Sequence, residues 1–193
     1  MSTGPGATRR SEASRQAILA ATEALCRESG YRRLTIEAIA ARAGVGKTTI
    51  YRWWTSKGAV VLELLDATAT TAVAPPDTGD LAADLHALLT EVVRLLTPPL
   101  TSPAVGLIAE ALQDPALGRE LRDRLIEPRI AAFKDRLRRA QDAGDLPADA
   151  DLDVALDLLY GPLYHRLAFH LDMPDAGYLA SLVAHVLRAL ASS

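Results

Sequence analysis

The chain has 193 residues, of which 49% are hydrophobic and 5% aromatic, and its formal net charge is −3. Ala and Leu dominate, while Val, Ile and Thr do not form alternating runs, so the composition predicts an all-α globular protein. No apolar run reaches the roughly 18 to 20 residues needed to span a bilayer, and the first residues lack the apolar stretch of a signal peptide. We therefore expect a cytoplasmic protein with no membrane partner.

The charge is divided unevenly along the chain. Residues 1–65 hold ten Lys or Arg against five Glu, whereas the remainder holds eleven basic against nineteen acidic side chains. A basic segment on an acidic body is typical of a nucleic-acid-binding domain joined to a domain that avoids DNA, although such charges also occur on ordinary solvated faces. The single cysteine, Cys26, excludes an internal disulfide and a multi-cysteine zinc site, and we expect its thiol to be buried and inert.

Four helices are predicted in the first third of the chain, over about 12–29, 35–43, 47–54 and 56–65. Each repeats apolar residues at helical spacing. Thr35 and Ser56 are candidate N-caps, and Gly30 and Gly44 are placed to end helices. Residues 1–11 are expected to form a flexible arm, in which Arg9 and Arg10 either enter a minor groove or belong to a disordered tail.

The Pro-containing segment 74–80 predicts a linker, and we divide the chain into a first domain at 1–65 and a second at 66–193. In the second domain, helical patterns cover about 81–96, 104–113, 114–143, 152–171 and 176–190. Pro128 should bend the long helix 114–143, because proline cannot donate the intrahelical hydrogen bond. The sequence thus predicts about nine helices and no strands.

Two short helices joined by Gly44-Val45-Gly46 have the form of a helix-turn-helix. Such a motif needs a tight turn and a second helix with one apolar side for anchorage and one polar side for DNA. Ile50 and Trp54 can anchor the second helix, together with Val45, while polar side chains lie on its other azimuths. The pattern favours DNA binding, but many helical pairs share a glycine turn.

The run from Thr35 to Val60 resembles the DNA-binding signature of TetR-family transcriptional regulators. It has Ile-Ala-x-x-Ala-Gly-Val into the turn, Thr-Ile-Tyr in the second helix and Ser-Lys opening the next one. The resemblance covers roughly residues 12–65. It implies an N-terminal helix-turn-helix domain and a larger C-terminal helical domain for effector binding and dimerisation. The implied function is a ligand-responsive repressor that binds a near-palindromic operator in double-stranded DNA and is released by a small-molecule effector.

The resemblance also implies roles for individual residues. Phosphate contacts fall on Thr35, Tyr51 and Lys57, which would fix the register without reading sequence. Candidates for contacts to base edges are Lys47, Thr48, Thr49 and Arg52, because the first turns of the recognition helix penetrate deepest into the groove. Each of these residues could instead be an ordinary surface or capping residue.

Three positions depart from the family pattern. Gly46 replaces the usual Ser, which removes a capping hydroxyl but eases the approach of the backbone to DNA. Trp53 replaces a frequent His, so its role at the DNA is open. Cys26 replaces a common aromatic residue and leaves a smaller anchor in the first helix.

Residues 43–49 also resemble the end of a phosphate-binding loop, whose Gly-rich backbone and Lys-Thr pair hold a nucleotide. The full motif needs Gly where Ala41 stands, and a helical pattern precedes the glycines where a strand is required. A nucleotide-binding protein is therefore the weaker alternative. The four histidines lack metal-ligand company, since His165 and His170 are five residues apart, so we expect no metal, no cofactor and no enzymatic activity.

The second domain is predicted to dimerise and to bind the effector. An apolar stripe in the last helix predicts a homodimer through the last two helices, although it could also be intramolecular core; it comprises Leu179, Leu182, Val183, Val186, Leu187 and Leu190. Aromatic and imidazole groups can orient a ligand in an apolar cavity, which makes Tyr160, Tyr164, His86 and His165 candidates for effector binding. The more ordinary interpretation of each is a core or interface residue, and the identity of the effector is open.

Overall fold

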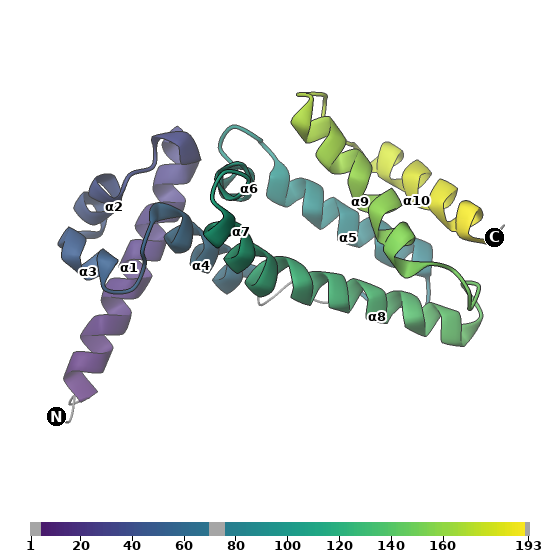
Figure 1. Ribbon diagram of the computed structural model, residues 1–193, viewed down its shortest axis with the longest axis horizontal. Helices are drawn as coiled ribbons and strands as arrows, with labels where there is room; N and C mark the ends of the chain where they lie inside the picture. Colours follow the sequence, from purple (N-terminus) through teal and green to yellow (C-terminus); the bar gives the residue numbers. More distant parts are fainter. Residues whose placement is uncertain (1–4, 70–75, 192–193) are drawn as a thin grey trace. The chain divides into compact units, whose positions relative to one another are not determined.

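The computed structural model describes residues 5–69 and 76–191, without the side chains of residues 5–10 and 69, and every regular element in these ranges is helical (Figure 1). The elements are α1 Pro5–Ser29, η1 Tyr31–Arg33, α2 Ile36–Ala43, α3 Lys47–Tyr51, α4 Lys57–Ala69, α5 Leu81–Leu96, α6 Pro103–Ala111, α7 Pro115–Leu121, η2 Arg122–Ile126, α8 Glu127–Ala143, α9 Leu152–Ala168 and α10 Ala176–Ala191. With α7, η2 and α8 counted as one interrupted helix and the three-residue 3-10 segment η1 set aside, the described ranges hold nine helices and no strand. This confirms the all-α prediction.

The chain forms two compact units. The N-terminal unit comprises residues 1–70 and 98–122, and the C-terminal unit comprises residues 71–97 and 123–193. The predicted domains are two continuous stretches of sequence divided at residue 65. In the structure, residues 98–122, which include α6 and α7, pack with the N-terminal unit. Within the described residues, no helix is long and apolar enough to cross a membrane.

Helix α1 starts at Pro5, so residues 5–11 are helical where a flexible arm was predicted. A proline is compatible with this position because the first N–H groups of a helix have no intrahelical acceptor. The side chains of Arg9 and Arg10 and the whole of residues 1–4 lie outside the described residues, and so does the proposed groove contact of the arm.

The core of the N-terminal unit is built from one apolar face of each short helix. The side chains of Ile18, Ile39, Ile50 and Leu62, which come from α1 to α4, are fully buried. Burying a side chain of this kind contributes roughly 1.5 to 3 kcal/mol. In this core α2 and α4 pack on α1, α3 packs on α2, and α6 packs on α4. Cys26 is buried as predicted, and burial raises the pKa of its thiol to about 11, against the opposing effect of Lys57.

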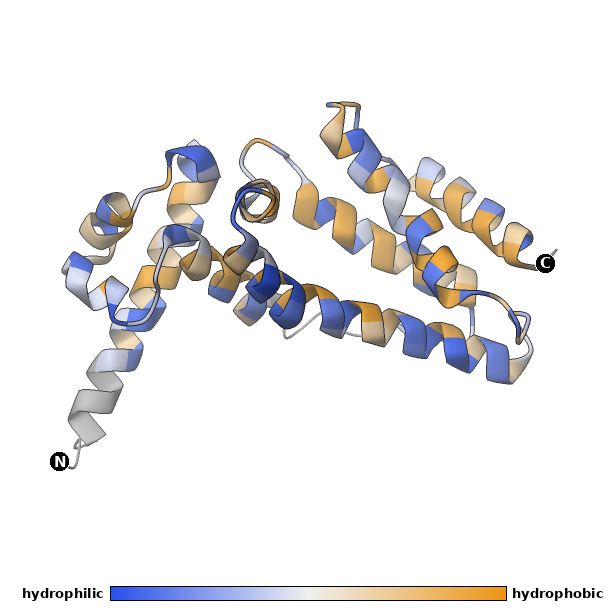
Figure 2. Ribbon diagram, viewed as in Figure 1, coloured by the Kyte–Doolittle hydropathy of each residue, from blue (hydrophilic) through white to orange (hydrophobic). Residues whose placement is uncertain are grey.

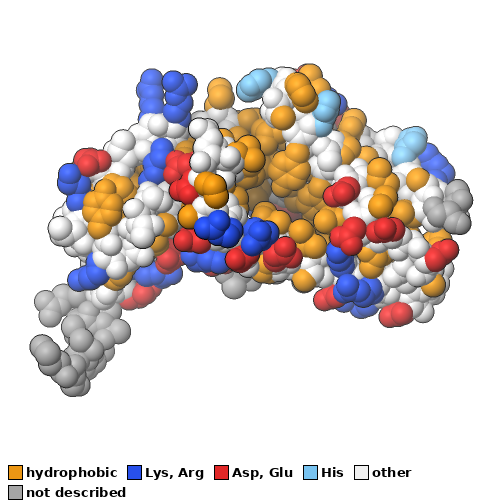
Figure 3. Space-filling view, viewed as in Figure 1, with side chains coloured by type: hydrophobic (Ala, Val, Ile, Leu, Met, Phe, Trp, Pro, Cys, Tyr) orange, Lys and Arg blue, Asp and Glu red, His pale blue; other side chains and the backbone are white. Residues whose placement is uncertain are grey.

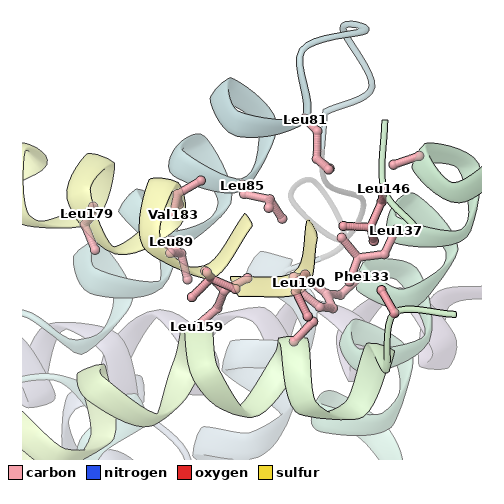
Figure 4. Packing of buried hydrophobic residues seen from close by; sticks show 14 of the residues in the cluster. Leu81, Leu85, Leu89, Phe133, Leu137, Leu146, Leu159, Leu179, Val183 and Leu190 are labelled. Carbon is pink, nitrogen blue, oxygen red and sulfur yellow. The ribbon is translucent and has the colours of Figure 1, made fainter. Parts of the chain in front are cut away.

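The core of the C-terminal unit lies among α5, α8, α9 and α10. Figure 1 shows α5, α9 and α10 side by side, and Figure 4 shows leucines and Phe133 meeting between the helices. The hydropathy colours of Figure 2 show α5 as largely apolar and α8 as largely polar with a narrower apolar face. Leu179, Val183, Val186 and Leu190 of α10 are buried in this core. The apolar stripe predicted for the dimer interface is thus largely used within the chain itself.

Helix α8 begins where the predicted long helix is interrupted. A π-helical turn, η2, separates α7 from α8 and ends one residue before Glu127 and two before Pro128. Proline cannot donate a hydrogen bond to the preceding turn and its ring crowds the carbonyl there, and a π-helical turn is one way for a helix to absorb such a break. The interruption therefore falls at the predicted position.

A buried ion pair joins α5 to α8. The Arg136 guanidinium donates to Asp84 at 2.9 and 2.7 Å, and the Thr78 hydroxyl donates to the same carboxylate at 2.7 Å. The Asp84 and Arg136 side chains are only 1% and 3% exposed. Burial alone would raise the pKa of Asp84, but the hydrogen bonds from Thr78 and Arg136 outweigh it and the pKa is lowered. The pair also fixes Thr78, at the end of the linker, to the helices.

Candidate DNA-binding site

The turn of the helix-turn-helix is set by local capping. The Thr35 hydroxyl accepts a hydrogen bond from the Ala38 N–H at 3.1 Å and so caps α2. Gly44 ends α2 with φ 66, a left-handed conformation that favours glycine over residues with a side chain. Gly46 is the N-cap of α3 and offers no side-chain hydrogen bond, as expected from the loss of the usual Ser. The two glycines thus shape the turn between the helices.

The recognition helix α3 is shorter than predicted. It ends at Tyr51, because the chain then turns to bring Trp54 into the core and to start α4, where the Ser56 hydroxyl accepts from the Ala59 N–H at 3.1 Å. The tertiary packing of Trp54, which is 4% exposed, outweighs the helical pattern through residue 54. Ile50 is fully buried and Val45 half-buried, so the predicted anchors all face inward to some degree.

A polar network fixes the end of α3. The Trp54 indole N–H donates to Glu63 of α4 at 2.7 Å, and the same carboxylate pairs with Arg15 of α1. Glu63 of α4 therefore links α1 to the turn that follows α3. Neither Glu63 nor Arg15 was identified from the sequence, because both belong to ordinary amphipathic helices and only the folded chain brings them to Trp54.

The predicted DNA-contacting residues differ in exposure. Most of them are exposed, namely Thr35, Gly46, Lys47, Thr48, Tyr51 and Arg52, while Thr49, Trp53 and Lys57 are half-buried. Tyr51 is 54% exposed, which is a large aromatic surface to leave in water on a five-residue helix. An exposed aromatic side chain with a phenolic hydroxyl suits contact with a polar macromolecule better than it suits the core.

Lys47 has an acidic neighbour on the preceding helix. Its ammonium lies 3.1 Å from the Glu37 carboxylate, and both side chains are more than half exposed. The pKa of Glu37 is lowered by its own backbone N–H and by Lys47. Exposed pairs of this kind contribute little to stability, so Lys47 can exchange Glu37 for an acceptor on DNA at small cost.

Trp53 contacts both of its neighbours in the turn that follows α3. Its ring meets Trp54 edge-on, with centroids 5.3 Å apart and planes at 83°, and the Arg52 guanidinium lies 5.3 Å from its centroid. The indole therefore extends the core outward and lies against the guanidinium of Arg52. This geometry gives Trp53 a structural contact and places it next to a predicted base-reading side chain.

Lys57 is turned toward its own unit. Its ammonium lies 3.6 Å from the Glu110 carboxylate of α6 and 4.6 Å from the centroid of the Tyr31 ring. Burial and the neighbouring Glu110 raise the pKa of the Tyr31 phenol above its ordinary value. Glu110 lies 53 residues beyond Lys57 in the sequence, and no motif connected the two.

The candidate effector residues lie on α5 and α9 of the C-terminal unit, His86 on α5 and the other three on α9. Tyr160 is half-buried and meets Phe133 edge-on at 5.8 Å, and burial raises the pKa of its phenol. The His86 ring lies 3.1 Å from the Ala176 carbonyl oxygen, which ties α5 to the start of α10. Tyr164 and His165 are exposed, and His165 contacts Phe169. Figure 3 shows histidine side chains at the surface over the C-terminal helices.

The glycine-rich fragment 43–49 follows a helix, α2, and not the strand that a phosphate-binding loop requires. Among the described residues, no group of three or more His, Cys, Asp or Glu side chains is arranged to hold a metal ion. The anchored α3 and its exposed polar side define instead a helix-turn-helix protein of the DNA-binding class.

Comparison with known proteins identifies the family. Residues 18–64 match the model of bacterial regulatory proteins of the tetR family, and residues 75–186 match the tetracyclin repressor-like C-terminal domain. The chain is 34% identical to the HTH-type transcriptional regulator YdeS of Bacillus subtilis (strain 168), over 94% of this chain and 91% of YdeS. It is 33% identical to the DNA-binding transcriptional repressor TetR of Mycobacteroides abscessus, over 94% and 95% of the two chains.

Solved structures agree with the sequence comparison. The TetR family transcription regulator SCO0332 superposes with a TM-score of 0.74 at 34% identity, over 91% of this chain and 97% of that one. A complex of SmeT with triclosan has the same fold, with a TM-score of 0.62 at 24% identity over 92% and 91% of the chains. The chain belongs to the TetR family. It is a helix-turn-helix transcriptional regulator, and its family is not one of enzymes.

Proposed function

We propose that this regulator is a repressor that binds a near-palindromic operator as a homodimer and is released by a small-molecule effector. The observation that carries the proposal is the recognition helix α3, which is anchored by Ile50 and Trp54 and exposes Lys47, Thr48 and Tyr51. Repression is supported by the related repressor of Mycobacteroides abscessus. Because operator DNA is its partner, we place the protein in the cytoplasm.

The proposal is tested by selecting bound sequences from random duplex DNA with the purified protein. We expect one near-palindromic site whose half-site centres lie about one helical turn or more apart, protected on both halves in a footprint. Absence of any enriched sequence, or protection of a single half-site, would contradict the proposal. Nucleotide binding without DNA binding would restore the phosphate-binding-loop alternative.

Positioning and reading are assigned to different side chains. Thr35, Tyr51 and Lys57 contact phosphates, and Gly46 allows the backbone of α3 to approach DNA. The base edges are read by Lys47, Thr48, Thr49 and Arg52, with Trp53 supporting Arg52 by the contact described above. A lysine or arginine prefers the acceptors of guanine, and a threonine can meet the methyl group of thymine.

Substitutions at the two kinds of position should differ in their effect on sequence preference. Lys47→Ala is expected to cost about 1 to 3 kcal/mol of operator binding and to relax preference at one or two base pairs. Tyr51→Phe and Lys57→Ala should weaken binding by similar factors on all sequences, and Lys57→Ala should lower the salt slope by about one unit. Titration of each variant against the operator and single-base variants measures both effects. A uniform loss for Lys47→Ala removes it from the base-reading set.

The dimer is proposed to form through α9 and α10. The face of α9 with Val154 and Leu158 is exposed at a spacing of four residues, and α10 exposes Ala180 and Ala184 at the same spacing. Apolar and small side chains in these rows would let two copies pack as a four-helix bundle. This interface uses residues other than the predicted stripe, which is largely core.

Leu158→Arg is expected to give a monomer at micromolar concentration, because it places a charge in the proposed apolar contact. Sedimentation velocity of the wild type and the variant measures the change. Leu112→Arg is the matched control, since Leu112 is 83% exposed and lies in the N-terminal unit, and it should leave the dimer intact. An unchanged dimer for Leu158→Arg would place the interface elsewhere.

The effector is proposed to bind the C-terminal unit among Tyr160, Tyr164, His86 and His165. The solved structures of the same fold include a complex of SmeT with triclosan, a small molecule. If an effector releases the operator, its affinity for free and operator-bound protein should differ by roughly 5- to 150-fold, since allosteric coupling is typically 1 to 3 kcal/mol and reciprocal. A candidate ligand that binds both forms equally in calorimetric titration is not the inducer.

A further inference from the structure

The side chain of Lys57 has two partners within the N-terminal unit. Its ammonium is 3.6 Å from the Glu110 carboxylate and lies over the Tyr31 ring at 4.6 Å. The Lys57 and Glu110 side chains are 27% and 31% exposed, so water screens their attraction less than it does in the Lys47–Glu37 pair. Lys57 is thus the one predicted DNA-contacting cation with a partly buried counter-charge among those described.

Close packing keeps the Glu110 carboxylate in place. A Cβ atom on Gly58, the neighbour of Lys57, would lie 3.0 Å from Glu110 Oε1 and 2.7 Å from Leu117 Cδ2. A Cβ atom on Gly106, one turn before Glu110 on α6, would lie 2.1 Å from the Tyr31 ring. A larger side chain at Gly58 would push α4 away from α6 and α7, and one at Gly106 would push Tyr31 away from α6. The two glycines therefore bring the carboxylate to the start of α4.

We propose that Glu110 competes with an operator phosphate for Lys57 and so sets an upper limit on the affinity for DNA. This inference rests on the proposed phosphate contact of Lys57. The Lys57–Glu110 pair has no net charge, so it attracts a phosphate less than an unpaired lysine does, and the carboxylate also repels the incoming phosphate. Operator binding must therefore break the Lys57–Glu110 pair, at a cost that a free lysine does not have.

The position of Glu110 makes this competition adjustable. It belongs to residues 98–122, which pack in the N-terminal unit but continue at both ends into α5 and α8 of the C-terminal unit. A rearrangement of α5 or α8 can therefore shift Glu110, because the chain connects both helices directly to the segment that carries it. Glu110 is an affinity-determining residue outside the helix-turn-helix.

Glu110→Gln tests the proposal, because it removes the charge and keeps the shape of the side chain. We expect the variant to bind the selected operator about three- to tenfold more tightly than the wild type at equal salt, as measured by fluorescence anisotropy. Glu120→Gln is the matched control: it makes the same change in net charge at an exposed position of α7 and should alter affinity by less than about twofold. Circular dichroism verifies that both variants melt cooperatively.

A second background separates competition from a general change of charge. In Lys57→Met protein, Glu110→Gln should no longer tighten binding. Two results would overturn the proposal. Glu110→Gln alone could give no gain in affinity, or its gain could persist in the Lys57→Met protein. If Glu110→Gln fails to melt cooperatively, Glu110→Asp, which retracts the charge by one methylene, should give a smaller gain, and no gain again overturns it.

The outcomes distinguish this proposal from the proposed function. If the wild type selects no DNA sequence, the proposed function fails and the competition with it. If the wild type binds an operator and Glu110→Gln binds it no more tightly, only the competition fails.

Discussion

Arg136→Met is expected to destabilise the C-terminal unit by about 3 to 5 kcal/mol, because it leaves the Asp84 carboxylate buried without its counter-charge. Asp84 would keep only the hydrogen bonds from Thr78. Urea denaturation followed by far-UV circular dichroism measures the free energy of unfolding. Both tryptophans lie in the N-terminal unit, so their fluorescence follows the unfolding of that unit and serves as the reference for the loss in the C-terminal unit.

The double variant Asp84→Leu/Arg136→Met is the control for this prediction. It removes both charges and replaces them with apolar groups of similar size, and such replacements are often neutral or stabilising. It should therefore recover most of the loss. A double variant as unstable as Arg136→Met would contradict this account.

The wild type should also lose stability in acid. Because the pKa of Asp84 is lower in the folded protein than its unfolded value of about 3.9, the ionised carboxylate stabilises the fold above that value. This stability is lost as the pH falls through the lower folded pKa.

Trp54→Ala is expected to cost the N-terminal unit about 3 to 5 kcal/mol, because Trp54 is 4% exposed and its loss leaves a large cavity at the end of α3. The Glu63 carboxylate would also lose the indole N–H. Since the recognition helix would lose its C-terminal anchor, operator binding should fall with stability. Urea denaturation followed by the fluorescence of Trp53 and by circular dichroism measures the first effect.

Trp53→Phe is the comparison for Trp54→Ala. Trp53 is half-buried, and phenylalanine retains an aromatic ring for the edge-on contact with Trp54. The free energy of unfolding of the N-terminal unit should therefore change by no more than about 1.5 kcal/mol. Equal losses for the two variants would mean that Trp54 is not the main anchor of α3.

Local signals made the helix-turn-helix predictable. Thr35, Gly44 and Ser56 determine helix ends through their own hydrogen bonds and backbone angles, which depend on residues within one turn of the chain. The end of α3 was predicted three residues too late because the burial of Trp54 is a tertiary effect. Glu110 could not be linked to Lys57 from the sequence for the same reason.

The C-terminal unit was less predictable at the level of single residues. The periodicity of α10 identifies an apolar face, but it does not distinguish a face that packs on α5 and α9 from one that packs on a second copy. The structure assigns Leu179 and Val183 to the chain's own core. Ligand-lining roles have no periodic signature at all, so the effector residues remain predictions.

The path of the chain through the N-terminal unit limits how the regulator can be divided into modules. Residues 98–122 return to this unit after α5, and they supply Leu117 against Gly58 and Gly106 against Tyr31. A fragment cut after residue 65 would expose the apolar surfaces that these residues cover. Residues 1–65 therefore do not contain the whole N-terminal unit. A chimaera that joins this unit to another C-terminal domain must transfer two separate stretches of sequence.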